Sequence, residues 1–354
     1  MIEIDGGEGS GSGTIVRLAV SLCTILGEEL RLTNIRAKRD KRGLRPQHQQ
    51  VVTACASLCG GEVERAEVGS SEITYRPGQR IKGGAYEWDI GTAGSTTMLA
   101  MSLILVCCFA DKPSALTLKG GLFQDFAPSA HHMRRVLLPL LQRMGVDAEL
   151  DVKRPGYIPE GQGILQVRVE PAKAGLRPLI LTDQGKVTSA RGIALSSHLA
   201  EQEVSERMAD ECSTRLKEAG YDAEIEAVYE TSASQKGADL SVWVETDSSV
   251  IMGSDRAGKL GRRSEEIGRY VAASLLDDLK SGATVDRYVA DQLIPFCAIA
   301  AGASEYVMPS VTEHVETNLW LVERILGAGT RLDGQRLRIE GVGDRLHHQG
   351  QFGK

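Results

Sequence analysis

The sequence contains no run of about 18 uncharged apolar residues, and this absence argues against a conventional membrane-spanning helix. The chain begins MIEIDGG, which predicts a strand rather than a signal peptide. Its seven cysteines are an odd number and lack the spacing of a zinc site, so we interpret them as reduced core residues. With 354 residues, 42% of them hydrophobic, the chain is long enough for two domains, and we expect a cytoplasmic protein.

A general excess of positive charge is also missing, because the formal net charge is -6. The exception is local, since the ten residues Arg36 to Arg45 contain six cations and one acid. Such a run is often only a solvated face. Because this run follows a predicted strand (Leu30 to Ile35) and leads into a predicted helix at His48, the alternative is a phosphate site beside a helix N-terminus.

Three predicted helices open on histidine, at His48, at His131-His132 and at His314. Each histidine follows small or polar residues and precedes an apolar helical run, a stop that contains glycine, and a strand. Self-similarity of this kind indicates a repeat architecture. His48 and His131 are 83 residues apart (131 minus 48), whereas His131 and His314 are 183 apart (314 minus 131). The third repeat is therefore interrupted by about one hundred residues, roughly one small domain.

These spacings give a domain plan. We predict a core of residues 1–183 and 284–345, with repeat units of about 1–80, 81–175, and 176–183 joined to 284–345. Residues 184–283 form an inserted α/β domain, and residues 346–354 form a polar, disordered tail that includes His347-His348. Within the insertion we expect strands near 187–195, 222–229 and 239–246, and helices near 200–219 and 264–280.

A glycine-rich turn, in the sequence DGGEGSGSGTIVR that ends at Arg17, joins the first predicted strand to a helix. The second unit repeats the arrangement as DIGTAGSTT between Asp89 and Thr97. Glycines let backbone amides approach an anion, and a helix N-terminus adds its positive end. The Walker lysine is missing, which excludes a P-loop. Both turns thus have two interpretations, as anion-binding loops or as structural turns of the repeat.

The matching helix of the third unit carries Tyr288, Asp291 and Gln292, spaced three to four residues apart on one face. These polar side chains can cap the helix, or they can line a site that His314 faces from the next helix. Taken alone, His314 is better explained as a helix-start histidine that nearby backbone satisfies than as a catalytic residue.

Taken together, DGGEGSGSGTIVR, NIRAKRDKRGL with Gln47-His48, IGTAGSTT, YVADQLIPF and the His314 segment with Thr317-Asn318 resemble the RNA 3'-terminal phosphate cyclase family. The likeness covers nearly the whole chain in order. It implies an α/β fold of the α+β type, with three repeated units of a four-stranded sheet and two helices, plus a smaller inserted α/β domain.

The resemblance also implies an ATP-dependent reaction on an RNA that ends in a 3'-phosphate. His314 would attack the α-phosphate of ATP and form a covalent histidine-AMP with release of pyrophosphate. The AMP would pass to the RNA 3'-phosphate, and the neighbouring 2'-hydroxyl would then close a 2',3'-cyclic phosphate and release AMP. A neutral imidazole is a competent nucleophile near pH 7, and the 2'-hydroxyl explains why RNA is required.

The resemblance assigns the remaining site residues position by position. Arg17, Arg36 and Arg39 would hold phosphates of ATP or of the RNA end. The positions that line the nucleotide pocket match Gln47, Pro128, Tyr288, Asp291 and Gln292. His131 and His132 are expected to support the site from behind or to lie at the surface, and His198 belongs to the inserted domain.

The chain departs from the family at two positions. Ser10 stands where the family usually carries a metal-binding glutamate, and Met101 stands where it usually carries a glutamine. Glu8, two residues before Ser10, could supply the missing carboxylate for Mg²⁺ or Mn²⁺. The alternative is that ATP phosphates and water hold the metal and that Glu8 is only solvent-exposed.

Two other functions stand as alternatives. A cyclase-like protein that binds RNA or serves ribosome assembly, with weak or no catalysis, would fit the departures at Ser10 and Met101, whereas retention of His314 favours an enzyme. A dinucleotide-dependent oxidoreductase fits poorly, because no convincing βαβ unit with an acidic residue about twenty positions on follows the glycine loop. The physiological RNA and the oligomeric state, a homodimer included, stay open.

Overall fold

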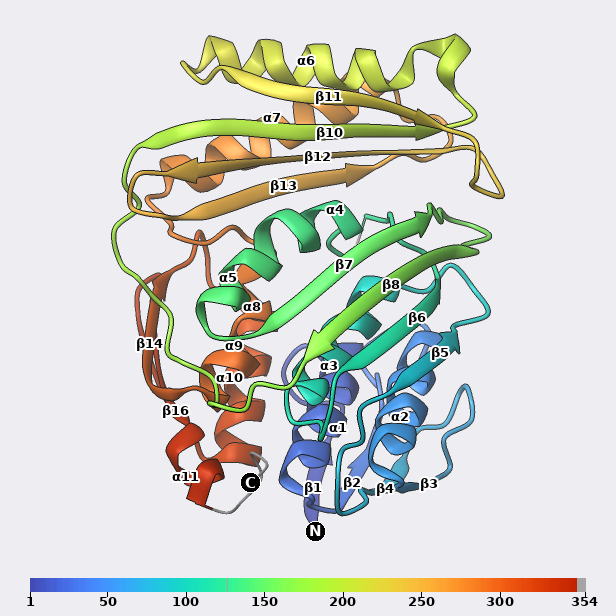
Figure 1. The fold of residues 1–354 in the computed structure, drawn as a ribbon, viewed down its shortest axis with the longest axis vertical. Helices are drawn as coiled ribbons and strands as arrows, with labels where there is room; N and C mark the ends of the chain where they lie inside the picture. The colour runs from blue at the N-terminus through green and yellow to red at the C-terminus, as the bar shows by residue number, and fades with distance from the viewer. Residues whose placement is uncertain (126, 349–354) are drawn as a thin grey trace.

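The computed structural model describes residues 1–125 and 127–348, the last two as backbone only. It contains four four-stranded sheets, each mixed in strand direction. Figure 1 shows three of these sheets in the lower lobe, around a central group of helices, and the fourth sheet at the top of the molecule. The expected class, α/β of the α+β type with repeated sheet units, is therefore confirmed.

The first unit has the order β-α-β-α-β-β, and its sheet order is β1-β2-β4-β3. Only β1 and β2 are parallel, because a crossover helix joins them. The elements are β1 (Ile2–Asp5), α1 (Gly13–Leu26), β2 (Leu30–Thr33), α2 (Pro46–Cys59), β3 (Glu62–Glu64) and β4 (Ile73–Arg76).

The second unit repeats this topology with the sheet order β5-β6-β8-β7. Its second helix is one continuous helical stretch with a π-helical turn at Met133–Leu137 between α4 and α5. The elements are β5 (Ala85–Asp89), α3 (Thr96–Cys107), β6 (Ser114–Gly120), α4 (Ala130–His132), α5 (Leu138–Arg143), β7 (Asp147–Arg154) and β8 (Gly163–Glu170).

The third unit has the same order again, β9-β14-β16-β15. Its first helix is split into α8 and α9, because Pro295 at the start of α9 has no N–H to donate to the preceding turn. The elements are β9 (Ile180–Leu181), α8 (Val289–Gln292), α9 (Ile294–Ile299), β14 (Ala301–Val307), α10 (Glu313–Leu326), β15 (Gly329–Asp333) and β16 (Arg336–Val342). The prediction of three related units with a histidine near the start of the second helix agrees with these elements.

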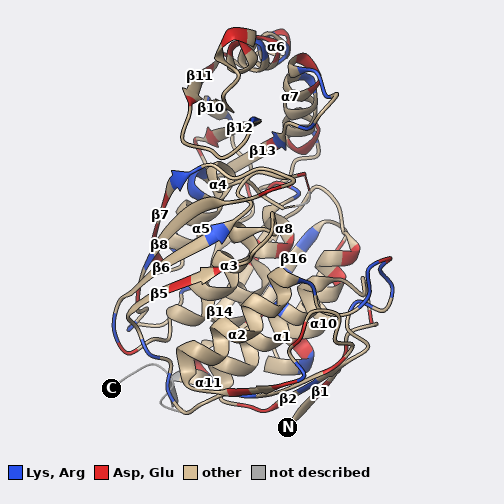
Figure 2. Ribbon diagram, turned by 90° about the vertical axis from the view of Figure 1, so that its right-hand side faces the viewer, with Lys and Arg blue, Asp and Glu red and all other residues tan. Residues whose placement is uncertain are grey.

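The inserted sheet has the order β11-β10-β12-β13, and α6 and α7 cover one of its faces. Figure 2 shows this lobe above α4 and α8, with acidic and basic residues interspersed along its two helices. Its elements are β10 (Val187–Ser197), α6 (Val204–Glu218), β11 (Ala223–Glu230), β12 (Gly237–Thr246), β13 (Ile251–Ala257) and α7 (Ser264–Lys280). The sequence did not predict β13, because Gly253, Ser254 and Asp255 interrupt its apolar pattern, although all three are buried.

The prediction that a disordered tail begins at residue 346 is wrong for residues 346–348. Helix α11 spans Gly343–His348, and Leu346 is 2% exposed, so the chain is still packed where the tail was predicted to begin. The rest of that segment lies outside the described residues.

The central helices carry the apolar core. Most of α1 is buried, and α1 packs against α2, α3 and α10, so helices of all three units meet along it. All seven cysteines are free and buried, as expected of reduced core residues. None of the helices in the described part of the chain is long and apolar enough to cross a membrane.

Candidate active site

The glycine-rich loop of the first unit is fastened to the helix that carries His314. The backbone N–H of Ser10 donates to Thr317 Oγ1 over 2.8 Å, and that hydroxyl donates to the carbonyl of Glu313 over 2.5 Å. Gly9 has a φ of +45°, and a Cβ there would overlap Thr317 Oγ1. Glycine is therefore required for the loop to approach α10, and this contact brings units 1 and 3 together.

The N-termini of α1 and α10 both have side-chain caps. Ser12 Oγ accepts from Thr14 N over 3.4 Å, and Thr312 Oγ1 accepts from Val315 N over 3.2 Å. The first turn of α1 contains no acidic residue. Its positive end is therefore not neutralised locally, which suits an anion.

His314 is the second residue of α10 and is exposed to solvent. Partial burial of the ring lowers its pKa below 6.5, the positive charges of Arg17 and Arg39 lower it further, and Glu313 opposes them. The imidazole is therefore neutral at pH 7, which is the nucleophilic form. The same shift shows that Arg17 of α1 and Arg39 of the cationic run lie near this ring.

A narrow pocket lies beside α1, between helices of the first, second and third units. Burial lowers the pKa of Arg17 to about 10 although Asp291 opposes it, and burial raises the pKa of Asp291 to about 7 although Arg17 opposes it. Gln292 is 3% exposed, and its Oε1 has no hydrogen-bond partner in the described structure. The pocket also contains Met101. It is lined by Thr14, Arg17, Leu18, Ser21, Met101, Ser102, Leu105, Asp291, Gln292, Pro295, Phe296 and Asn318.

The side chain of Asn318 connects the helices around this pocket. Its Oδ1 accepts from Thr14 Oγ1 over 3.1 Å, and its Nδ2 donates to the carbonyl of Asp291 over 3.0 Å. One buried amide thus fixes α10 against both α1 and α8. These hydrogen bonds fix the positions of α10, which carries His314, and of α8, which carries Asp291, relative to α1, which carries Arg17.

The cationic run is a loop in which positive charges crowd together. Arg36 has a φ of +56°, and its pKa is lowered by partial burial and then by Arg39 and Arg45. Lys38 Nζ donates to the carbonyl of Gly9 over 2.9 Å, which places the loop against the glycine-rich turn. The Nε atom of Arg39 is buried and makes no hydrogen bond to any described residue. An unused buried guanidinium donor among like charges fits an anionic ligand such as a polyphosphate.

Gln47 joins the first unit to the second, whereas the hydrogen bonds of the His48 ring lie within the first unit and that of the Pro128 carbonyl lies within the second. Gln47 Oε1 accepts from Ser95 N, in the cap of α3, over 2.9 Å, and the carbonyl of Pro128 accepts from Thr97 Oγ1 over 2.8 Å. His48 is buried against Gly13, where a Cβ would overlap its ring, and burial, Arg17, Arg36 and Arg45 lower its pKa well below 6.5. Its environment is therefore structural, in contrast to the exposed position of His314.

Tyr288 directly precedes α8, the helix that carries Asp291 and Gln292, and has helical backbone angles, φ -87° and ψ -41°. Its ring lies edge-on to His132, with ring centroids 5.5 Å apart. His132 is 1% exposed, so it does not lie at the surface, which was one of the two positions expected for it. His198 lies in the inserted domain, as expected, and contacts the carbonyl of Ala233. Burial and the nearby Asp255 raise the pKa of the Tyr288 hydroxyl. Tyr288 therefore lies next to residues of the second unit and of the inserted domain.

Among the side chains that the structure describes, residues 1–125 and 127–346, no three His, Cys, Asp or Glu groups lie together as a metal site. Asp5 already accepts from Gly7 N and Asn34 Nδ2, and Ser10 Oγ donates to Ser12 Oγ over 3.0 Å. Glu8 is an exposed carboxylate on the same loop. The donors fit a cation only if a ligand such as ATP supplies most of the coordination.

The structure therefore places several predicted site residues close together: His314, Arg17, Arg36, Arg39, Asp291 and Gln292. Gln47 contacts this group through the ring of His48. Sequence reasoning missed Lys38 as a partner of the glycine loop and Asp286 as the cap of α8. The role of Asp286 had a signal in the sequence, because an aspartate just before a helical run is a common cap. The role of Lys38 had no such signal, since its partner Gly9 is 29 residues away.

Comparisons with known proteins point in one direction. The sequence model of the RNA 3'-terminal phosphate cyclase family matches residues 8–332. The RNA 3'-terminal phosphate cyclase of Methanopyrus kandleri is 38% identical over 342 residues, which is 95% of this chain and 96% of the relative. The protein of the same name from Archaeoglobus fulgidus is 36% identical over 340 residues, which is 96% of this chain and all of the relative.

Proposed function

The chain belongs to the RNA 3'-terminal phosphate cyclase family, and from this premise we propose that it uses ATP to convert an RNA 3'-terminal phosphate to a 2',3'-cyclic phosphate through a histidine-AMP intermediate on His314. The chain is thus an enzyme of RNA processing, a ligase that transfers a nucleotidyl group. The observation that carries the proposal is the environment of His314: an exposed imidazole with a lowered pKa, at a capped helix start, beside Arg17 and Arg39.

The chemistry proceeds in three displacements at phosphorus. A ring nitrogen of His314 forms a bond to the α-phosphorus of ATP, and the bond to pyrophosphate breaks. An oxygen of the RNA 3'-phosphate then attacks the same phosphorus, which breaks the N–P bond and gives an RNA end joined to AMP. Finally the 2'-hydroxyl attacks the RNA phosphorus, loses its proton, and displaces AMP. Each leaving group is stabilised by positive charge nearby.

We assign the phosphates to the arginines and the rest of the nucleotide to the pocket side chains. Arg17, Arg36 and Arg39 have guanidinium groups that are partly desolvated and crowded, so a bound phosphate relieves their mutual repulsion. Asp291 and Gln292 offer acceptors from α8, and Gln47, Pro128 and Tyr288 extend the site toward the second unit. A divalent cation would neutralise the polyphosphate, with Glu8 as its protein ligand.

The direct test uses two RNAs that differ only at the 3'-end. With ATP and a divalent cation, we expect an RNA that ends in 3'-phosphate to become resistant to phosphatase and to release AMP, whereas the 3'-hydroxyl RNA should do neither. Equal AMP release from both RNAs would mean that the site does not read the terminal phosphate. Stable RNA binding without AMP release would support the non-catalytic alternative instead.

The pH dependence of the first step should follow the histidine. Only neutral His314 attacks, so the single-turnover labelling rate should rise with pH along an acid limb with its midpoint below 6.5 and level off above it. Arg39→Gln should move this limb to higher pH, because it removes a cation that disfavours the protonated ring. A limb that stays in place in Arg39→Gln would contradict the assignment. Because burial raises the pKa of Asp291 to about 7, the same profile in Asp291→Asn shows whether this carboxyl contributes to the acid limb.

A further inference from the structure

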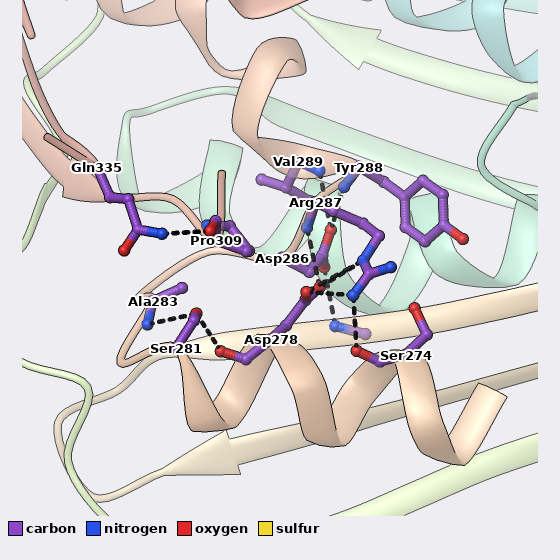
Figure 3. A network of polar contacts seen from close by, with 11 residues as sticks. Ser274, Asp278, Ser281, Ala283, Asp286, Arg287, Tyr288, Val289, Pro309 and Gln335 are labelled. Atoms are coloured by element: carbon purple, nitrogen blue, oxygen red, sulfur yellow. Dashed lines mark hydrogen bonds and ion pairs between the residues drawn. The ribbon is translucent and has the colours of Figure 1, made fainter. Parts of the chain in front are cut away.

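Asp286 lies two residues before Tyr288 and is fully buried. Its Oδ1 accepts from the backbone N–H groups of Tyr288 and Val289, each over 2.9 Å, and so caps the start of α8. Its Oδ2 accepts from Gly253 N over 2.8 Å and lies 3.1 Å from His132 Nε2. Figure 3 shows this carboxylate below the first turn of α8, next to Tyr288.

These partners come from three separate parts of the fold. Gly253 is in β13 of the inserted domain, His132 ends α4 of the second unit, and α8 belongs to the third unit. The contact with β13 is close, because a Cβ at Gly253 would press against Val136 and His132. One carboxylate therefore links the inserted domain and the second unit to the helix that presents Asp291 and Gln292.

Asp286 and His132 form a pair of ionisable side chains in the interior of the protein. Both side chains are at most 1% exposed, and removal of two charges from water often outweighs their attraction. His132 Nδ1 has no hydrogen-bond partner in the part of the chain that the structure describes. The ring also meets Tyr288 edge-on at 5.5 Å. A pair that is costly for stability and that touches a nucleotide-site residue is more simply explained by a positioning role.

We propose that Asp286 and His132 are positioning residues for ATP, which fix the start of α8 so that Tyr288 and the pair Asp291 and Gln292 face the nucleotide from their two sides. The inserted domain contributes the N–H of Gly253 to this carboxylate. The way in which the inserted domain packs on the core therefore affects the affinity for ATP. This inference rests on the proposed function, because it requires that α8 contacts the nucleotide.

Asp286→Asn tests the role with little change in volume. The asparagine oxygen can still accept from Tyr288 N and Val289 N, but its NH₂ group then faces the N–H of Gly253 and His132. We expect the KM for ATP in His314 labelling to rise about tenfold, as for loss of a charge-assisted hydrogen bond, whereas the maximal rate and the KM for RNA change less than about threefold.

His132 provides a second, independent pair of variants. His132→Gln retains an N–H donor toward Asp286 and should stay near the wild-type KM for ATP, whereas His132→Leu removes the donor and should follow Asp286→Asn. The matched control is Glu265→Gln, which breaks the ion pair with Arg207 inside the inserted domain, at 2.9 and 2.7 Å, without touching α8. We expect wild-type kinetics from this control.

The possible results separate the two levels of the proposal. If Asp286→Asn and His132→Leu keep the KM for ATP within about twofold of wild type, or lose only thermal stability and maximal rate, the positioning role is overturned. That result with a normally labelled wild type leaves the proposed function intact. A wild-type protein that takes no label from ATP would overturn the proposed function and this inference together.

Discussion

His314→Asn is expected to abolish the covalent label that the protein takes from α-labelled ATP, with a loss of at least about a thousandfold in the labelling rate. Asparagine has a similar size and no nucleophilic ring nitrogen. Because His314 is exposed and is not among the buried residues of α10, the fold should be retained. The measurement is the acid-labile, alkali-stable radioactivity on the protein, together with thermal unfolding to show that the variant is folded.

The control for this experiment is His198→Asn. His198 lies in the inserted domain, where its ring contacts the carbonyl of Ala233 and its backbone N–H donates to the carbonyl of Glu230, so its replacement should leave the label unchanged. His48 and His132 are poorer controls, because both are buried and His132 contacts Asp286 of another unit. Full-strength labelling of His314→Asn would show that another residue is the nucleophile, and the assignment of His314 would be withdrawn.

The sequence predicted the repeat because each unit repeats a local pattern. A histidine, an apolar helical run, a glycine stop and a strand are all readable within about 25 residues, so the three units could be aligned without long-range information. Helix α7 was predicted with its observed bounds, Ser264–Lys280, since serine and two glutamates at its start are typical of a helix N-terminus. Local signals were weaker in β13, where burial of Ser254 and Asp255 depends on tertiary partners.

The arrangement of the site could be predicted only in part, because its contacts join distant segments. Ser10 and Thr317 are 307 residues apart, and His132 and Asp286 are 154 apart. No local pattern reports such pairs. The spacing of Tyr288, Asp291 and Gln292 predicts one helical face, and Tyr288 directly precedes the four-residue helix α8 with helical backbone angles. The bonds of Asp286 to the N–H groups of Tyr288 and Val289, which cap this helix, were not predicted from the sequence.

The two departures from the family lie in different environments. Met101 lines the pocket with Arg17 and Asp291, where we propose that the nucleotide binds. Ser10, in contrast, is 5% exposed, with its N–H on Thr317 and its hydroxyl on Ser12. The hydroxyl hydrogen of Ser10 is therefore used within the loop, and a neutral hydroxyl is a weaker ligand for a hard cation than a carboxylate. If a protein ligand for the cation exists here, the exposed carboxylate of Glu8 is the better candidate.

Glu8→Ala is therefore expected to raise the Mg²⁺ or Mn²⁺ concentration for half-maximal labelling of His314, on the order of tenfold to a hundredfold, because it removes the one free carboxylate that the described glycine loop offers. Glu3→Ala is the matched control, since Glu3 is an exposed glutamate of β1 that faces Arg31. Ser10→Glu should leave the metal requirement unchanged or lower it, with some loss of stability because Ser10 is buried. Unchanged metal dependence in Glu8→Ala would instead mean that ATP phosphates and water hold the cation, and that Glu8 is only a solvated side chain.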